Sequence, residues 1–257
     1  AVLLLVLNVQ HQQRRVAKLM RDIERSGGTS VLADPILVQC WRRLRDGPIQ
    51  RSAFVQLEGR GFDSAWLQEH DDLKDIKIGH LHLIDTRLDG WDLSRLAAQH
   101  SLELLKGQNI HNADVLAQAL SDQPNLFALE LPDSDLSDAG FRELPLPQLR
   151  WLDVSGSRVS LESLKQIEKC SCLTRLTVDG SQFNGQIKDI ILKLDRPHFY
   201  LNLRGQSVTD QHIKLLREMK VGGKVLDVVL LNTSASPDAI KQLQSEFLPP
   251  FKVTVRN

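Results

Sequence analysis

The stretch LRWLDVSGSRVSLESL, at residues 149–164, decides the fold of this chain. Leu152 and Val154 alternate with polar residues, as in a strand with one buried face. After Ser160, Leu161 and Leu164 are separated by three residues, which is typical of a short helix. The stretch therefore predicts one strand followed by one helix.

The same pattern recurs about every 25 residues from Leu57 to the end of the chain. The central strand position of each unit is apolar, and so is the residue five positions later. The strand positions are Leu57, Leu83, Leu105, Leu131, Val154, Val178, Leu203 and Leu230, and the later positions are Phe62, Leu88, Ile110, Leu136, Val159, Phe183, Val208 and Ala235. Self-similarity at a fixed period predicts stacked units that form a solenoid.

The residue two positions before the strand position is apolar in every unit except one. The exception is Glu103, two residues before Leu105. Leu102 and Leu104 also allow a register shifted by one residue, and such a shift would exchange the two faces of that strand. The register of this unit stays open at the level of the sequence.

Two further stretches, LTRLTVDGSQF at 173–183 and FYLNLRGQSVTDQHIKLL at 199–216, repeat the pattern L-x-x-L-x-L and resemble leucine-rich repeats. The resemblance covers roughly residues 53–257 and implies an α/β solenoid with a concave parallel sheet and helices on the convex side. The family often has Asn three residues after the strand position. Here the residues are Arg60, Thr86, Gln108, Ser134, Ser157, Ser181, Gln206 and Thr233, and all except Arg60 are uncharged groups that could satisfy turn backbone.

Helix starts follow the strands at regular places. Ser160, Thr209 and the pair Ser236-Pro237 are expected at N-caps, where their oxygens accept from free backbone N–H groups. The final FKVTV, with Val253 and Val255, predicts one more strand that closes the stack of about eight units.

The first residues differ in character from the rest. The chain opens with AVLLLVLNV followed by QHQQRR, so residues 1–7 are interpreted as the tail of a truncated membrane anchor. The alternatives are a buried capping helix from Val2 to Arg25 and the remnant of a signal sequence. Residues 8–52 are predicted to form a helical N-terminal cap, with TSVLA as an edge strand and a second helix from Asp34 to Arg45, and residues 53–257 form the repeat domain.

An anchor, a cap and repeats together resemble bacterial membrane-anchored leucine-rich-repeat proteins of unassigned function. Basic residues beside a span are retained in the cytoplasm, so Arg14 and Arg15 favour a cytoplasmic repeat domain.

Composition and cysteine usage limit the possible partners. The chain has 32 basic and 32 acidic residues, which gives no reason to expect a nucleic-acid partner, although residues 1–51 are basic. Cys40, Cys170 and Cys172 lack metal-binding spacing and are expected to be small buried residues in a reducing compartment. No cofactor is predicted.

Catalytic signals are few. His80 and His82 would share one face of a strand, beside Glu58 of the preceding unit, and could hold a metal ion. The alternative is that both histidines are exposed to solvent or bind a partner. A metal-dependent enzyme is therefore the second function considered.

The concave face provides the main functional hypothesis. Its first zone is largely apolar and consists of Phe54, Gln56, Ile84, Leu102 and Leu104 together with the histidines. Its second zone is predicted to bind a protein partner and consists of Trp151, Asp153, Arg175, Asp179, Tyr200, Asn202, Arg204 and Asp227. Trp, Tyr and Arg dominate interface energies, although a charged solvated sheet face is the alternative. The leading hypothesis is a noncatalytic interaction module, and a third is a scaffold within a larger chain whose other domain carries the activity.

Overall fold

The computed structural model describes residues 18, 21–22, 29–32, 52–58, 77–88, 93–98, 100–194, 198–221, 225–247 and 252–256. It shows an α/β fold with one ten-stranded sheet, whose strands follow the order of the chain from β1 to β10. β1 (Thr29–Leu32) pairs antiparallel with β2 (Ser52–Glu58), and every later pairing is parallel. The α/β class predicted from the sequence is therefore confirmed.

The described chain places one helical segment after most of its parallel strands. The remaining strands are β3 (Lys77–Ile84), β4 (Leu104–Gln108), β5 (Ala128–Glu130), β6 (Trp151–Asp153), β7 (Arg175–Asp179), β8 (His198–Arg204), β9 (Val225–Leu231) and β10 (Lys252–Arg256). The helices are α4 (Ser94–Ala97), α5 (Ala113–Leu120), α6 (Asp138–Glu143), α7 (Leu161–Leu164), α8 (Gly185–Lys193), α9 (Asp210–Val221) and α10 (Pro237–Glu246), with 3₁₀ turns η2 (Leu146–Gln148), η3 (Lys165–Lys169) and η4 (Gly180–Gln182).

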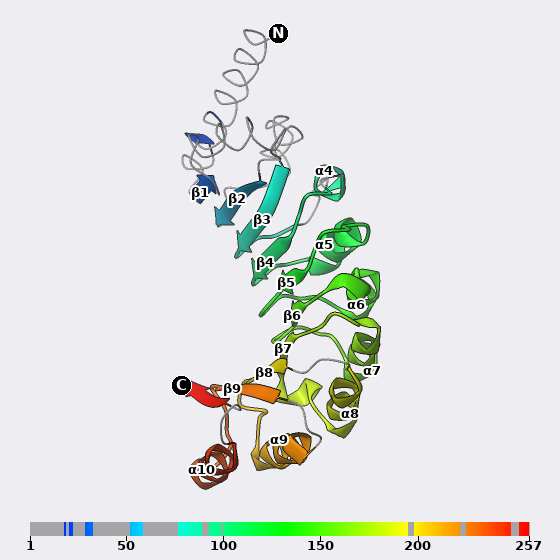
Figure 1. The fold of residues 1–257 in the computed structure, drawn as a ribbon. Helices are drawn as coiled ribbons and strands as arrows, with labels where there is room; N and C mark the ends of the chain where they lie inside the picture. Colours follow the sequence, from blue (N-terminus) through cyan, green and yellow to red (C-terminus); the bar gives the residue numbers. More distant parts are fainter. Residues whose placement is uncertain are drawn as a thin grey trace, which may run out of the picture.

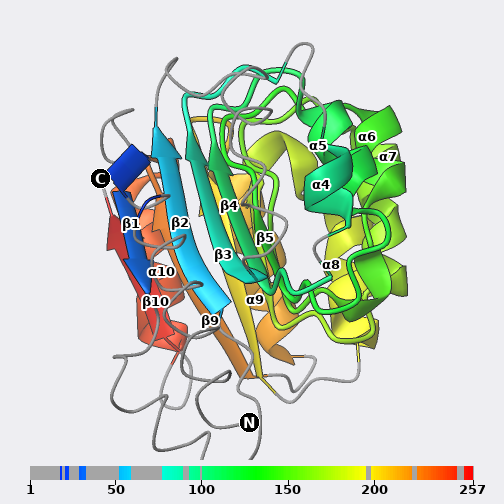
Figure 2. The same ribbon diagram turned by 90° about the horizontal axis from the view of Figure 1, so that it is seen from above.

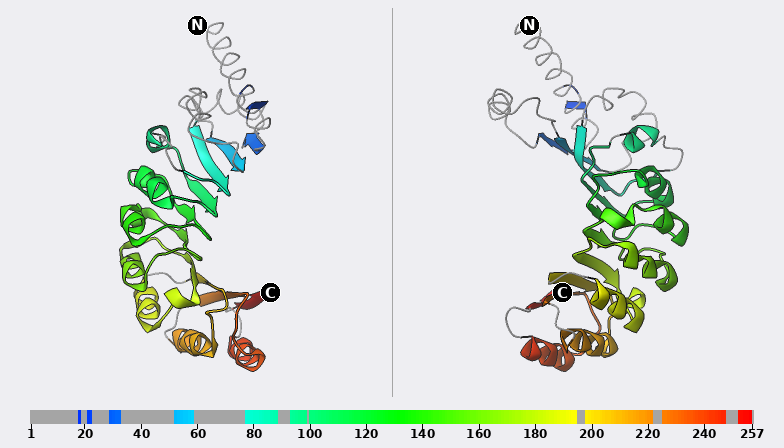
Figure 3. Two further views of the ribbon diagram at one scale, coloured as in Figure 1. Left: turned by 180° about the vertical axis from the view of Figure 1, so that it is seen from behind. Right: turned by 45° about the vertical axis from the view of Figure 1, so that its right-hand side comes forward.

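The strands and helices form two layers that curve together (Figure 1). The sheet lines the inner side of the arc, and helices α4 to α9 follow one another along the outer side (Figure 1 and Figure 3). Seen from above, helices α4 to α8 lie along one face of the sheet, and the face of β4 to β8 that is turned away from them is the second face (Figure 2). We call this second face the open face.

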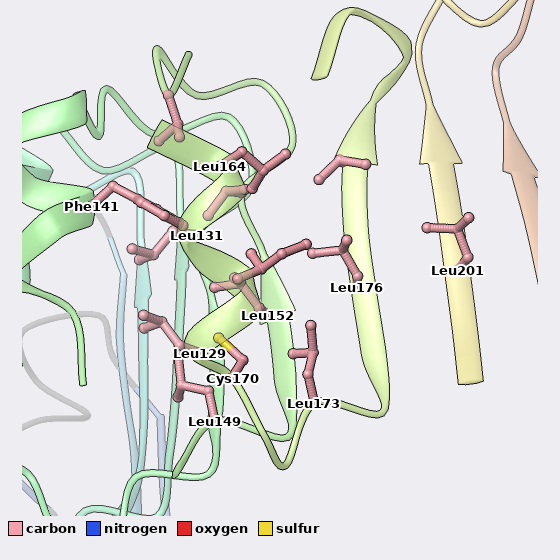
Figure 4. Close-up of a cluster of buried hydrophobic side chains, with 14 of the residues drawn as sticks. Leu129, Leu131, Phe141, Leu149, Leu152, Leu164, Cys170, Leu173, Leu176 and Leu201 are labelled. Carbon is pink, nitrogen blue, oxygen red and sulfur yellow. The ribbon is translucent and has the colours of Figure 1, made fainter. Parts of the chain in front are cut away.

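The layers are joined by a row of apolar side chains that runs across the sheet. Register places one such residue opposite the next in each pair of neighbouring strands. The members are Leu81, Leu105, Leu129, Leu152, Leu176, Leu201 and Val228, all buried. Helix residues such as Phe141 and Leu164 pack against this row. Cys170, which follows η3, belongs to the same buried cluster (Figure 4). The core is therefore continuous from one unit to the next, because no unit could bury its apolar face alone.

The structure corrects the register in the unit that the sequence left open. The residue aligned with Leu83 and Leu131 is Gly107, whereas Leu105 pairs with Leu81 and Leu129. The intervals on either side of Gly107 are both 24 residues. A shift of two residues keeps the faces unchanged, so Leu105 stays buried. A Cβ atom on Gly107 would lie 2.8 Å from Ile110 and from Leu131, whose side chains fill the space of the missing one.

The turns after the strands share an unusual backbone conformation. Positive φ angles of 50–57° occur at Asp85, Asn109, Asp133 and Asn232, and of 71° and 90° at Gly156 and Gly205. Asp, Asn and Gly are the residues that adopt this conformation at least cost. The polar residues that follow the strands thus have a backbone role that the apolar periodicity did not reveal.

Neighbouring helices are tied at their first turns by Asp and Ser. Ser137, the N-cap of α6, donates its backbone N–H to Asp114 of α5 over 2.8 Å. Ser160 donates to Asp138 over 2.7 Å, and Ser236 to Asp210 over 2.6 Å. The predicted N-caps Ser160 and Ser236 also accept from Ser163 and Ala239, which confirms them. α7 ends at Leu164, and η3 continues it as a 3₁₀ turn.

Polar residues inside the turns satisfy backbone groups in some units only. Ser134 is buried and accepts from the backbone N–H of Ile110 over 3.0 Å. Thr86 is also buried and donates to the carbonyl of Ile84. Gln108 and Ser181 are exposed, and neither side chain forms a hydrogen bond with turn backbone among the described residues. In the second case the neighbouring Gln182 takes that role and donates to the carbonyl of Val159 over 3.0 Å.

Predictions for the two ends meet the structure only in part. The expected strands at TSVLA and FKVTV are confirmed as β1 and β10. Of the helix expected from Val2 to Arg25, Lys18, Arg21 and Asp22 are described and are helical. The apolar residues 1–7 and the second cap helix lie outside the described residues. None of the helices in the described ranges has the length and apolar content needed to span a bilayer.

Adjacent residues of β8 provide a test of the two faces. Leu201 is fully buried, whereas Tyr200 is 37% exposed on the open face. We expect Leu201→Ala to lower the free energy of unfolding by about 2–5 kcal/mol, because it leaves a cavity in the shared core. Tyr200→Ala should lower it by about 1 kcal/mol or less. Urea unfolding of both variants measures the difference, and equal losses would contradict the assigned faces.

Two glycines provide a second matched test. A Cβ atom on Gly180 would lie 2.5–2.6 Å from backbone atoms of Ser207 and Val208 in the next unit, whereas nothing lies within 4 Å of one on Gly185. We expect Gly180→Ala to destabilise by about 1–3 kcal/mol, since backbone must move. Gly185→Ala, in the first turn of α8, should be neutral or stabilise by up to about 1 kcal/mol. Thermal melts that rank the variants in the opposite order would show that the units pack differently.

Candidate functional site

The open face carries three cross-strand rows of side chains. The first row contains Leu104, Ala128, Trp151, Arg175, Tyr200, Asp227 and Lys252, aligned by strand register. The second contains His82, Lys106, Glu130, Asp153, Thr177 and Asn202. The third includes Asp179, Arg204 and Leu231. All eight residues predicted for partner binding thus lie on this face, in three adjacent lines.

In the first row, aromatic rings surround Arg175. Its guanidinium carbon lies 4.5 Å from the ring centroid of Trp151 on one side and 5.3 Å from that of Tyr200 on the other. Phe127 meets Trp151 edge to face, with centroids 5.9 Å apart. His198 lies beside Tyr200 at 4.6 Å. We call these five residues the aromatic–arginine cluster.

His198 connects this cluster to the next strand. Its Nε2 atom lies 3.1 Å from an Oδ atom of Asp227. The imidazole therefore contacts Tyr200 on one side and the carboxylate on the other. Each member of the aromatic–arginine cluster thus contacts at least one neighbour, which restricts these side chains before any partner arrives.

The third row contains a network around Arg204. Its guanidinium forms an ion pair with Asp133 over 2.8 Å, which joins the end of β8 to the turn after β5 across two intervening strands. The same group reaches the hydroxyl of Ser155 at 3.4 Å. Ser155 in turn donates from its backbone N–H and its hydroxyl to Asp153, over 3.0 and 2.7 Å. Asp179 accepts from the backbone N–H of Gly156 over 2.7 Å.

Burial controls the ionisation of this network. Burial raises the pKa of Asp153 to about 6, even though Ser155 donates two hydrogen bonds to it. Burial also raises the pKa of Asp179. The hydrogen bond to Asp133 raises the pKa of Arg204, which therefore stays charged. Arg204, Asp153 and Asp179 thus have bonding partners within the chain, which makes them less available to a partner than the sequence suggested.

The other expectations for the open face need correction. Leu102 is fully buried and does not contribute to the apolar zone. Thr177 is 5% exposed, although it belongs to an open-face row, and its hydroxyl accepts from Asn202 over 3.0 Å. Leu104 and Ile84 are half-buried, as expected for that zone.

The strand neighbours of the histidines differ from those expected for a metal site. Register pairs Glu58 with Ile84 rather than with a histidine, and the strand neighbour of His82 in the next unit is Lys106. Burial and the nearby Lys106 charge lower the pKa of His82. Within the described ranges, no group of three or more His, Cys, Asp or Glu side chains is arranged to hold a metal ion.

Three contributors to the site were missed by the sequence argument. Phe127 lies just before β5 and His198 is the first residue of β8, and neither was among the residues expected on the concave face. Asp133 lies in a turn, and only the three-dimensional curvature brings it to Arg204. The sequence shows that Arg204, Asp153 and Asp179 carry opposite charges, but it does not show which of them form pairs.

Comparisons with known proteins do not assign the chain to a family. No protein-family model matches the chain, and no curated protein matches it significantly.

The raised pKa of Asp153 generates a pH-dependent prediction. Its folded pKa of about 6 exceeds the ordinary 3.8, so the ionised carboxylate costs stability at neutral pH, and this cost vanishes as the pH falls toward 4. We expect Asp153→Asn to melt higher than the unsubstituted protein at pH 7.5 but not at pH 4.5.

Asp135 is the control. Burial acts to raise its pKa, but the backbone N–H groups of Ala113 and Asn112 and nearby cations outweigh it, and the pKa is lowered. Its stabilisation is present above pH 3.8 and is lost as the pH falls, so Asp135→Asn should melt lower at pH 7.5. A melting difference for Asp153→Asn that does not change with pH would contradict the assignment.

Proposed function

We propose that this chain is a leucine-rich-repeat solenoid that binds another protein on the open, concave face of its sheet, without catalysis. The solenoid is supported by strand-and-helix units of nearly constant length and by a core that continues through all of them. The open side of the arc offers an extended surface, which suits binding of a macromolecule better than enclosure of a small substrate.

The aromatic–arginine cluster is the observation that carries this proposal. Tyr200 is exposed, Trp151 and Arg175 are half-buried, and they lie side by side on neighbouring strands. These three residue types contribute most to measured interface energies when a partner covers them. Their mutual contacts fix their positions, so a partner would lose little free energy in ordering them.

The alternative functions have less support. A metal-dependent enzyme at His80 and His82 would need further ligands, and the described residues contain no group of three or more His, Cys, Asp or Glu side chains that could hold a metal ion. A scaffold within a larger chain is compatible with the same binding face, and it differs only in where an activity would reside. Membrane attachment and a cytoplasmic location rest on residues 1–7 and remain predictions from the sequence.

Site-specific photocrosslinking in the native host tests the proposal. A benzoylphenylalanine placed at Tyr200 or Asn202 would lie on the open face, and the same residue at Gln186 or Gln242 would lie on exposed positions of α8 and α10. We expect a discrete protein adduct from the first pair and none from the second. Adducts from the helical positions alone would overturn the assignment of the face.

The adduct, once identified by mass spectrometry, allows a quantitative test with purified proteins. We expect Trp151→Ala combined with Tyr200→Ala to weaken binding at least about tenfold, because both rings would be covered in the complex. Arg142→Ala on the exposed surface of α6 is the control and should leave affinity unchanged. Equal affinity of the double variant and the unsubstituted protein would refute this face as the site.

A further inference from the structure

The inference concerns Arg175 and rests on the proposed function, because it names the chemistry that the open face would recognise. Arg175 lies in the first row of the open face, with Trp151 and Tyr200 on the two neighbouring strands. Neighbouring strands are about 4.8 Å apart, so the two rings limit movement of the guanidinium to either side. Its position is therefore fixed by cation–π contacts at 4.5 and 5.3 Å.

Arg175 differs from the other arginine on this part of the face. Arg204 has a carboxylate, Asp133, within 2.8 Å. Among the described residues no carboxylate forms an ion pair with Arg175, and the nearest acid in its own row, Asp227, is bonded to His198 instead. The two rings approach the guanidinium through cation–π contacts, and its N–H groups form no hydrogen bond with another described residue.

We propose that Arg175 is the receptor for a single carboxylate, an aspartate or glutamate side chain in an extended segment of the protein partner. A guanidinium offers two parallel N–H groups that match the two oxygens of a carboxylate. Because the rings already hold the group in place, little side-chain entropy is lost when the anion binds.

The surroundings select one carboxylate rather than a polyanion. The second row has no cation between Glu130 and Asn202, and Asp153 lies there beside the strand of Arg175. Asp227 follows Tyr200 in the first row. A nucleic acid or a multiply phosphorylated segment would place further negative charges against these carboxylates. An isolated acidic side chain, flanked by apolar residues that cover Trp151 and Tyr200, avoids that repulsion.

A peptide selection tests this chemistry before the partner is identified. A displayed library of random dodecapeptides is selected on the immobilised unsubstituted protein and, in parallel, on Arg175→Met and Arg175→Glu. We expect a conserved Asp or Glu among peptides enriched on the unsubstituted protein, loss of that preference on Arg175→Met, and a preference for Lys or Arg on Arg175→Glu. Arg142→Met, on α6, is the control, and a selection on this variant should enrich acidic peptides as the unsubstituted protein does.

Affinities of an enriched peptide then define the contact. Replacing its acidic residue with the amide should weaken binding about tenfold, as should Arg175→Met, and the two changes together should cost no more than either alone. Arg175→Lys keeps the positive charge but loses the two parallel N–H groups, so its affinity for the peptide should lie between those of the unsubstituted protein and Arg175→Met. The amide peptide measured on the unsubstituted protein tests the contact even if an Arg175 variant folds poorly.

The outcomes separate this inference from the proposed function. Peptides that lose affinity on the Trp151→Ala, Tyr200→Ala double variant but show no acidic preference would overturn the role of Arg175 and leave the face intact. An acidic preference that persists on Arg175→Met would overturn the inference as well, and so would a selection that enriches no acidic peptide. Peptides insensitive to every open-face substitution would count against both the inference and the proposed face.

Discussion

The stacking of buried apolar side chains from strand to strand is the constraint on which the rest of the structure depends. Leu152, Leu176 and Leu201 each contact the equivalent residue of a neighbouring unit, and no unit has a core of its own. The parallel strands must therefore keep a fixed register, because a slip by one residue would move an entire row to the wrong face. That register in turn aligns Trp151, Arg175 and Tyr200 into one line on the opposite face. The candidate site is thus a consequence of core packing.

Apolar periodicity was sufficient to predict the class of fold and most of the core. Ile213, Leu216 and Met219 of α9 are buried at helical spacing, as the sequence indicated. The failure at Leu105 has a physical cause. The unit has a glycine at its strand position, and the side chains of Ile110 and Leu131 fill the vacated space, so a search for apolar residues finds a leucine two positions too early.

The candidate site was harder to predict, because the alternation of apolar and polar residues along a strand assigns each side chain to a face of the sheet but does not identify the side chains that it contacts. Trp151, Arg175 and Tyr200 were identified from their types and their phase, and the structure shows them in contact with one another. Arg204 was grouped with them for the same reasons, but the curvature of the sheet brings Asp133 to it. The partner of a charged side chain depends on turn geometry three units away, and no short-range pattern encodes that.

The ion pair between Arg204 and Asp133 also bears on the mechanical behaviour of the arc. It joins two units on the inner side, across β6 and β7, where the distance between units must increase if the arc straightens. Flattening this region requires the bond to lengthen or break, whereas tighter bending does not. The pair is partly exposed, so its contribution is modest, about 1 kcal/mol or less, and weakens as salt is added. The resistance of the arc to bending from β5 to β8 is therefore directional, greater against opening than against closing, and dependent on ionic strength.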